Sequence, residues 1–190
     1  MIENEIKNVR SGKEGHIIAK MNSLLDTEII ALLYKASQEG VKIDLIVRGI
    51  CALKAGVPGL SENITVRSIV GRYLEHTRIY YFKNGGREKF FLASADWMQR
   101  NLNRRVEIMF PIDDDKIKER IRKILDIQLS DNARAHIQTD GVYKKPDRRG
   151  RATVDCQEIS MEEALENSKE PEEKEVKRIF FPKRKPELND

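Results

Sequence analysis

The sequence predicts a mixed α/β fold in which one sheet is flanked by helices. Apolar runs alternate with a helix-period pattern over the first 47 residues, shorter apolar runs with a hairpin signal follow, and another helix-period pattern begins near residue 113. The chain has 190 residues, of which 39% are hydrophobic and 35% are charged. This length is sufficient for one domain with a sizeable core.

The N-terminal part of the chain predicts the order helix, strand, helix, strand. Residues 2–10 place apolar side chains on one helical face, and residues 16–21 form an apolar run after a glycine-containing turn. Asp26 is expected to cap a helix that ends near Gly40, because an aspartate accepts hydrogen bonds from the free amides of a first helical turn. Residues 42–47 are the next apolar run. The two strands of such a unit lie parallel.

Polar residues follow both of these strands. Lys20 and Asn22 lie at the end of the first strand, and Arg48 comes directly after the second. In sheets of this kind, ligands bind beyond the carboxyl ends of the parallel strands. We therefore expect these three side chains to converge at one edge of the sheet.

The next part of the chain predicts a loop, several short strands and a long helix. Residues 52–62 contain glycine and proline and are expected to form the loop. Strands are expected at residues 64–70, 78–82, 89–94, 106–111 and 133–139. Asn84-Gly-Gly is a hairpin signal, and the acidic run from Asp113 begins a helix with negative charge at its positive end.

Beyond Gly141 the composition changes, and we expect the domain to end there, so that it comprises residues 1–141. Residues 158–190 are highly charged with sparse apolar positions. A short helix is expected at 161–167, and the rest of residues 142–190 is expected to be a charged, flexible tail.

Composition excludes several classes of protein. Cys51 and Cys156 are the two cysteines, too few for a disulfide scaffold or a four-cysteine zinc site, and they indicate a reducing compartment. His16 and His136 lack metal-ligand spacing, so no metal site is predicted. No apolar stretch approaches the roughly 20 residues that span a bilayer, and the N-terminus lacks the form of a signal peptide. We expect a cytoplasmic location. The net charge of +4 does not by itself indicate a polyanion partner.

The strongest chemical signal is His76, one of three histidines. Arg72 precedes it and Arg78 follows it, next to a predicted strand. An imidazole can move a proton while guanidinium groups hold phosphate oxygens. Phosphate chemistry is therefore the first hypothesis, although a lone histidine is more often a surface or satisfied core residue.

Several longer motifs carry a resemblance to a known family. They are Lys20-Met-Asn-Ser-Leu, Tyr34-Lys-Ala-Ser-Gln, Val47-Arg-Gly-Ile-Cys, Gly56-Val-Pro-Gly-Leu-Ser-Glu-Asn, Ser68-Ile-Val-Gly-Arg-Tyr-Leu-Glu-His and Ser94-Ala-Asp-Trp-Met. In order and spacing they resemble the C-terminal part of bacterial polyphosphate kinases, from about residue 5 to about residue 140. The resemblance implies a phospholipase-D-like domain, the second of two in that enzyme. The whole enzyme transfers the terminal phosphate of ATP to polyphosphate through a phosphohistidine.

The resemblance implies roles for the residues at the predicted strand ends. Arg48 corresponds to a position that binds nucleotide phosphate, and His76 to a catalytic-region histidine, acting as a general acid/base or hydrogen-bond donor. Arg78, Lys20 and Asn22 are further candidates for ATP or phosphate binding. Each of these residues has a structural alternative. Arg48 could form a surface ion pair and Arg78 an ion pair with Glu75. Lys20 or Asn22 could cap the helix that follows.

Ser94 and Asp96 are expected to support this site, since they resemble the place of the Gly-Ser-x-Asn segment in phospholipase-D-like proteins. Asp96 has an equal structural alternative as the cap of a short helix over residues 97–102. The chain departs from the His-x-Lys-x4-Asp pattern of that superfamily, because Arg78 replaces the lysine and Lys83 stands at the aspartate position. This departure weakens a phosphodiesterase function.

The resulting hypothesis is the second catalytic-region domain of a polyphosphate kinase. Its partners would be ATP or ADP, polyphosphate and the missing N-terminal domains, with Mg²⁺ bound in the full enzyme through ligands outside this chain. The chain resembles an excised fragment or an orphan domain, and we expect it to be inactive alone. The full enzyme is expected to be a homo-oligomer. Two alternatives stay open: a phospholipase-D-like phosphodiesterase or nuclease, and a non-catalytic polyanion-binding module.

Overall fold

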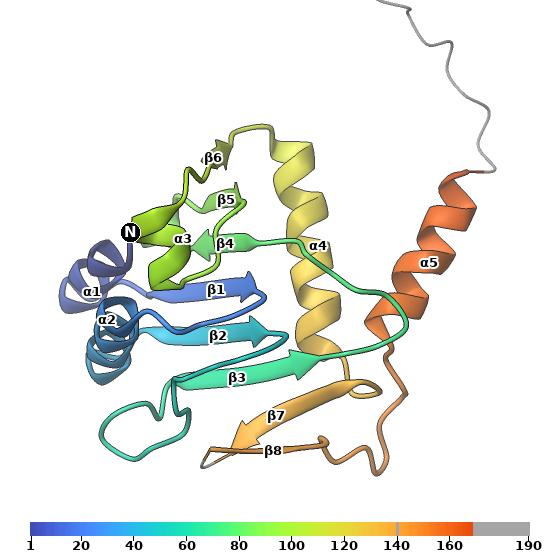
Figure 1. Ribbon diagram of the computed structural model, residues 1–190, viewed down its shortest axis with the longest axis horizontal. Helices are drawn as coiled ribbons and strands as arrows, with labels where there is room; N and C mark the ends of the chain where they lie inside the picture. Colours follow the sequence, from blue (N-terminus) through green and yellow to red (C-terminus); the bar gives the residue numbers. More distant parts are fainter. Residues whose placement is uncertain (140, 169–190) are drawn as a thin grey trace, which may run out of the picture.

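The computed structural model describes residues 1–139 and 141–168 and is built around a mixed eight-stranded sheet (Figure 1). The strand order is β6-β5-β4-β1-β2-β3-β7-β8. Helices α1 and α2 lie on one face of the sheet, and α4 and α5 lie on the other. The predicted fold class, a mixed α/β sheet flanked by helices, is confirmed.

Three parallel strands form the centre of the sheet. β1 (His16–Met21) pairs with β2 (Lys42–Val47), and β2 pairs with β3 (Ile64–Ile69). Helix α2 (Thr27–Gln38) connects β1 to β2. Its N-cap is Asp26, whose carboxylate accepts a hydrogen bond of 2.9 Å from the amide of Ile29. The predicted strand–helix–strand unit and its cap are therefore confirmed.

Antiparallel strands extend the centre on both sides. On one side they are β4 (Ile79–Phe82), β5 (Lys89–Ala93) and β6 (Met109–Ile112), and on the other β7 (Ala135–Thr139) and β8 (Val142–Lys144). The turn between β4 and β5 contains the 3₁₀ element η1 (Asn84–Gly86), where Asn84 has a φ of 50°. β6 begins three residues later than expected, at the position where Met109 pairs with Ala93. The short helix α3 (Gln99–Arg104) precedes it.

The period of two along the strands divides the core and decides which face receives each polar side chain. Ile17, Ala19 and Met21 pack with helices α1 (Ile2–Arg10) and α2, whereas Ile18 packs with α4 (Asp115–Ser130). Lys20 lies two residues after Ile18 and therefore faces α4. By the same alternation Arg48, two residues after the buried Ile46, faces α4 as well.

Buried Asp131 connects α4 to the elements that follow it. Its carboxylate accepts hydrogen bonds from the amides of Arg134 at 2.8 Å, Ala135 at 2.9 Å and Cys156 at 2.8 Å. These amides belong to the turn before β7, to β7 itself and to the first residue of α5 (Cys156–Asn167). One side chain thus fixes the end of α4 relative to β7 and α5.

The segment expected to be a tail contains two of these elements. β8 pairs with β7, and α5 is a helix of 12 residues that begins five residues before the expected short helix. It begins earlier because Asp155 caps it, accepting hydrogen bonds from the amides of Gln157 and Glu158. Residues 169–190 lie outside the described residues, and the boundary at residue 141 stays a prediction. None of the described helices is both long and apolar enough to span a bilayer.

Candidate functional site

The carboxyl ends of β1 and β2 meet one segment, the loop between β3 and β4. Lys20 from β1 places its Nζ 3.1 Å from Oε2 of Glu75. Arg48, directly after β2, donates from Nη1 to the backbone carbonyl of Glu75 at 2.7 Å. That carbonyl belongs to the peptide bond that joins Glu75 to His76. The structure therefore brings two of the predicted phosphate-binding residues to the segment that carries the predicted catalytic histidine.

Asn22 and Arg78 hold the same segment from the other side. With its amide oriented to satisfy both neighbours, Asn22 donates to the Glu75 carbonyl at 3.0 Å and accepts from Arg78 Nη2 at 2.9 Å. Arg78 also donates from Nη1 to the His76 carbonyl at 2.9 Å. The backbone of Glu75 and His76 is therefore held by three polar side chains from three parts of the chain.

Asp96 orients Arg78 and Asn22. Its Oδ1 accepts from Arg78 Nε at 2.9 Å and from the backbone N–H of Asn22 at 2.8 Å. The alternative role of Asp96 as a helix cap is wrong, because α3 begins at Gln99 and no side chain among the described residues caps it. Arg78 forms its ion pair with Asp96 rather than with Glu75, the partner that the sequence suggested. Asp96 is buried and brings its charge to the guanidinium of Arg78.

His76 itself is exposed. Within residues 1–139 and 141–168 the imidazole of His76 takes part in no hydrogen bond. The imidazole of His16, at the amino end of β1, differs because it pairs with Asp44 at 2.8 Å. The backbone contacts hold the main chain at His76, and its exposed side chain can meet a ligand. This is the arrangement that an acid/base group or a hydrogen-bond donor needs.

Ser94 lies outside this network. Its hydroxyl donates to the carboxylate of Glu107 and accepts from the amide of Ile108 at 3.0 Å. These bonds connect the end of β5 to the segment that leads into β6. In the structure the two predicted supporting residues therefore have different contacts: Asp96 touches candidate site residues, and Ser94 joins two strands.

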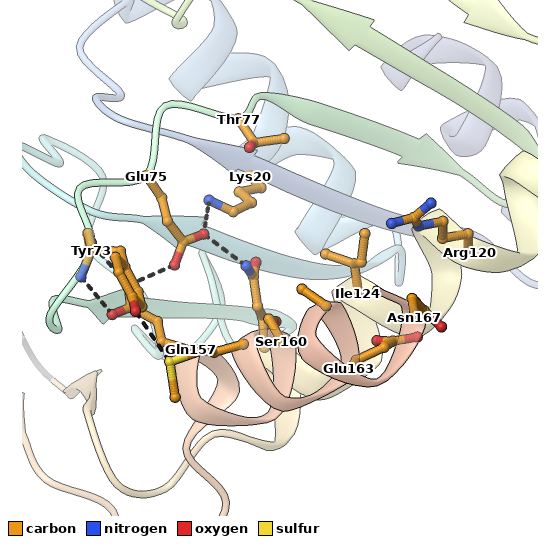
Figure 2. Close-up of a pocket in the computed structure, with 13 residues that line it drawn as sticks. Lys20, Tyr73, Glu75, Thr77, Arg120, Ile124, Gln157, Ser160, Glu163 and Asn167 are labelled. Atoms are coloured by element: carbon orange, nitrogen blue, oxygen red, sulfur yellow. Dashed lines mark hydrogen bonds and ion pairs between the residues drawn. The ribbon is translucent and has the colours of Figure 1, made fainter. Parts of the chain in front are cut away.

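Glu75, the residue at the centre of the network, is not among the site residues that the sequence predicted. Besides Lys20, its carboxylate accepts from Gln128 Nε2 of α4 at 3.0 Å. It also accepts from Gln157 Nε2 of α5 at 2.9 Å (Figure 2). Burial alone would raise the pKa of Glu75. The ammonium of Lys20 and the two side-chain amides together outweigh burial, so the pKa lies below its ordinary value of 4.5. Glu75 is therefore a carboxylate at neutral pH.

This lowered pKa gives a prediction for stability against acid. Because the pKa of Glu75 is lower in the folded chain than in the unfolded one, its contribution is complete above the ordinary pKa of 4.5 and is lost as the pH falls below it. We expect Glu75→Gln to lower the free energy of unfolding at neutral pH and to make its decline in acid shallower. Urea unfolding at about pH 7 and about pH 3.5 measures both. Parallel curves for the two proteins would contradict the expectation.

A pocket of about 430 Å³ opens beside this network. The loop between β3 and β4 forms one wall through Tyr73, Glu75 and Thr77, and α4 and α5 form the others (Figure 2). Lys20 reaches it from the sheet, and Arg120 of α4 lines it as well. The pocket is thus lined by both cationic and apolar groups.

The signal that could have identified Glu75 is its place in the Leu-Glu-His motif, directly before the candidate histidine. Gln128 and Gln157 carry no comparable signal, since they lie 53 and 82 residues away in the chain. Among the described residues, no group of three or more histidine, cysteine, aspartate or glutamate side chains is placed to hold a metal ion.

Comparison with known proteins identifies the family of the chain. The family described as "Polyphosphate kinase C-terminal domain 2" matches residues 1–157. The polyphosphate kinase of Burkholderia vietnamiensis is 61% identical over 155 residues, which cover 80% of this chain and 22% of that protein. The polyphosphate kinase of Pseudomonas aeruginosa is 55% identical over 146 residues, which cover 76% of this chain and 21% of that protein.

A solved structure gives the same result. The crystal structure of polyphosphate kinase from Porphyromonas gingivalis matches with a TM-score of 0.82 and 43% identity, covering 88% of this chain and 26% of that one. The chain therefore spans about a quarter or less of the length of these relatives. With a family match over residues 1–157 and a shared fold, the chain belongs to the polyphosphate kinase C-terminal domain 2 family.

Proposed function

We propose that this domain supplies one side of the active site of a polyphosphate kinase, which transfers the terminal phosphate of ATP to polyphosphate. The observation that carries the proposal is the convergence of Arg48 on the peptide bond that precedes His76, at 2.7 Å. A guanidinium and an accessible imidazole then lie at the carboxyl end of the parallel strands, the place where such sheets bind ligands. This pair suits an anion with several oxygens.

The hydrogen bonds separate ligand-binding groups from supporting ones. Arg48 donates to protein from Nη1, and since a guanidinium has five N–H donors, the others remain for phosphate oxygens. Arg78 uses Nε, Nη1 and Nη2 within the described network, so its role is to position His76 and Asn22. We therefore assign phosphate binding to Arg48 and His76, and support to Arg78, Asn22 and Asp96.

Lys20 belongs with the supporting groups as well. Its side chain is 8% exposed, and its ammonium is paired with Glu75. A direct contact between Lys20 and a phosphate would compete with that ion pair. The positive charge of Lys20 still contributes to the local potential that attracts an anion.

In the proposed reaction, Arg48 orients the phosphates of ATP and stabilises the charge that develops on the transferred group. His76 donates a hydrogen bond or a proton to a phosphate oxygen. The histidine that receives the phosphate lies, in this proposal, on another domain of the enzyme. The partners are thus ATP or ADP, polyphosphate and the remainder of the polyphosphate kinase, with the cytoplasm as the proposed compartment.

Magnesium is expected to accompany ATP in this chemistry, because it offsets charge on the phosphates. The described residues do not fit a magnesium site of their own. Glu75 and Asp96, the carboxylates nearest the proposed phosphate site, are engaged by Lys20 and Arg78. We therefore propose that Mg²⁺ is held by ATP itself and by other domains.

Binding and turnover of the 190-residue chain test the proposal together. We expect the chain to bind tripolyphosphate and ATP in calorimetry at low salt, with an affinity that falls as salt rises. His76→Ala is expected to weaken this binding, and the chain alone is expected to make no polyphosphate from ATP and Mg²⁺. Absence of binding would refute the phosphate site. Sustained synthesis by the chain alone would refute the need for a histidine on another domain.

The phosphodiesterase alternative is not favoured. It requires a lysine that is free to bind the phosphate two residues after the histidine, and this position holds Arg78, which is engaged by Asp96 and by the His76 carbonyl. Lys83, at the position of the aspartate in that pattern, forms an ion pair with Glu14. The histidine is present, but its partners in that chemistry are replaced.

A further inference from the structure

We propose that Glu75 is a positioning residue, through which helix α5 holds Arg48 and His76 in register with each other. The inference rests on the proposed function, since it concerns the same phosphate site. It assigns a role in this site to α5, a helix that the family match reaches only at its first two residues, Cys156 and Gln157.

The carboxylate of Glu75 and its backbone carbonyl are bound from different elements. The carboxylate contacts Lys20 of β1 at 3.1 Å, Gln128 of α4 at 3.0 Å and Gln157 of α5 at 2.9 Å. The carbonyl of the same residue accepts from Arg48 at 2.7 Å. A displacement of the carboxylate therefore moves the acceptor that orients Arg48, together with the next residue, His76.

Gln157 contacts other residues of the loop besides Glu75. Its Oε1 accepts from the amide of Tyr73 at 2.9 Å, and its Nε2 donates to the carbonyl of Tyr73 at 2.9 Å as well as to Glu75. The fit is close, since a Cβ atom added to Gly71 would lie 2.4 Å from Oε1 of Gln157. One amide side chain thus fixes the loop over residues 71–75.

The helix that carries Gln157 is itself attached to the body of the domain. Asp131 accepts from the amide of Cys156 at 2.8 Å, and Arg134 pairs with Asp155 at 2.9 Å. Near the other end of α5, Lys123 of α4 pairs with Glu163 at 2.9 Å. Because these contacts hold α5 against α4 and β7, Gln157 is a fixed reference point for the loop.

Gln157→Glu tests this inference by replacing the side-chain NH₂ group with an oxygen at nearly the same place. The new carboxylate would stand where Nε2 now lies, 2.9 Å from Oε1 of Glu75. Two carboxylates at this distance cannot both be charged without strong repulsion, so one pKa of the pair rises. The other charged or titratable groups around Glu75 are Lys20, Arg48, His76, Arg78, Tyr73 and the thiol of Cys156, with Arg120 and Glu163 across the pocket. All of them are the same in variant and parent, so the ratio of the two affinities at each pH isolates the added carboxylate.

We expect Gln157→Glu to bind tripolyphosphate about tenfold more weakly than the parent chain near pH 7.5, where repulsion displaces Glu75. Near pH 5 a shared proton restores the hydrogen bond, and the affinities of variant and parent should agree within about twofold. Gln38→Glu is the matched control, because Gln38 is exposed and its side-chain amide donates to the carbonyl of Gly59 rather than to a residue of the proposed site. Its ratio to the parent chain should not change with pH.

Equal affinity of Gln157→Glu and the parent at both pH values would overturn the inference, and so would a loss of the same size at both. Gln157→Ala, which adds no charge, provides a second test and should weaken binding severalfold at both pH values; unchanged affinity would also overturn it. The proposed function is tested separately by Arg48→Ala. If Arg48→Ala weakens binding and the Gln157 variants do not, only the role of α5 is refuted.

Discussion

Replacing Arg48 by alanine is expected to weaken the binding of tripolyphosphate to this chain by about tenfold to a hundredfold. A charge-assisted hydrogen bond contributes about 1.5–3 kcal/mol, which corresponds to that range of affinity. The loss should exceed that of a distant cation, because Arg48 is half-buried and its guanidinium is fixed on the Glu75 carbonyl at 2.7 Å. Arg48→Lys should restore a part of the affinity, since it returns the charge without the planar fork.

Calorimetric titration of the parent chain and both variants at two salt concentrations measures this effect. Arg10→Ala is the matched control, because Arg10 is an exposed arginine of α1 that pairs with Glu39, a surface pair of small energetic value. If Arg10→Ala weakened binding as much as Arg48→Ala, the anion would be attracted by net charge rather than bound at the proposed site.

Replacing Asp131 by alanine is expected to lower the free energy of unfolding by about 3 kcal/mol or more. Asp131 is 2% exposed, and its carboxylate accepts from the amides of Arg134, Ala135 and Cys156. Removing it leaves three amides without their acceptor, of which those of Ala135 and Cys156 are buried, and each unsatisfied buried donor costs about 1–3 kcal/mol.

Urea unfolding followed by circular dichroism measures this loss. Asp126→Ala is the control: Asp126 is exposed on α4, and alanine is the better helix former, so stability should be unchanged or slightly higher. A loss below about 1 kcal/mol for Asp131→Ala would show that α5 and β7 are held without these three bonds.

The sequence was sufficient to predict the central layer of the fold. The runs that form β1 and β2 are apolar on both faces, as strands buried between two layers of helices must be, and the cap Asp26 stands where the helix begins. The order of these elements then fixes Lys20 and Arg48 at the same edge. For this reason the approach of these two side chains to the same segment could be expected from the sequence.

The partners of these side chains could not be predicted in the same way. Glu75 and Gln157 are 82 residues apart, and their bond depends on where α5 packs, which no local pattern specifies. Asp96 stands where a short helix was expected, so its carboxylate suggested a cap, but tertiary contact with Arg78 determines its role. Likewise the sequence does not indicate the partner of His16, because Asp44 lies on the neighbouring strand β2 and is 2.8 Å away only in the folded sheet.

The placement of Cys156 has a consequence for the chemistry of its sulfur. The thiol is 2% exposed, and burial together with the neighbouring carboxylate of Asp131 raises its pKa, so the reactive thiolate is scarce. Oxidants and alkylating reagents can therefore reach this sulfur only during brief local openings in which the helix lifts from the sheet. The rate of its covalent modification is then the intrinsic rate of an exposed cysteine multiplied by the small equilibrium constant of that opening.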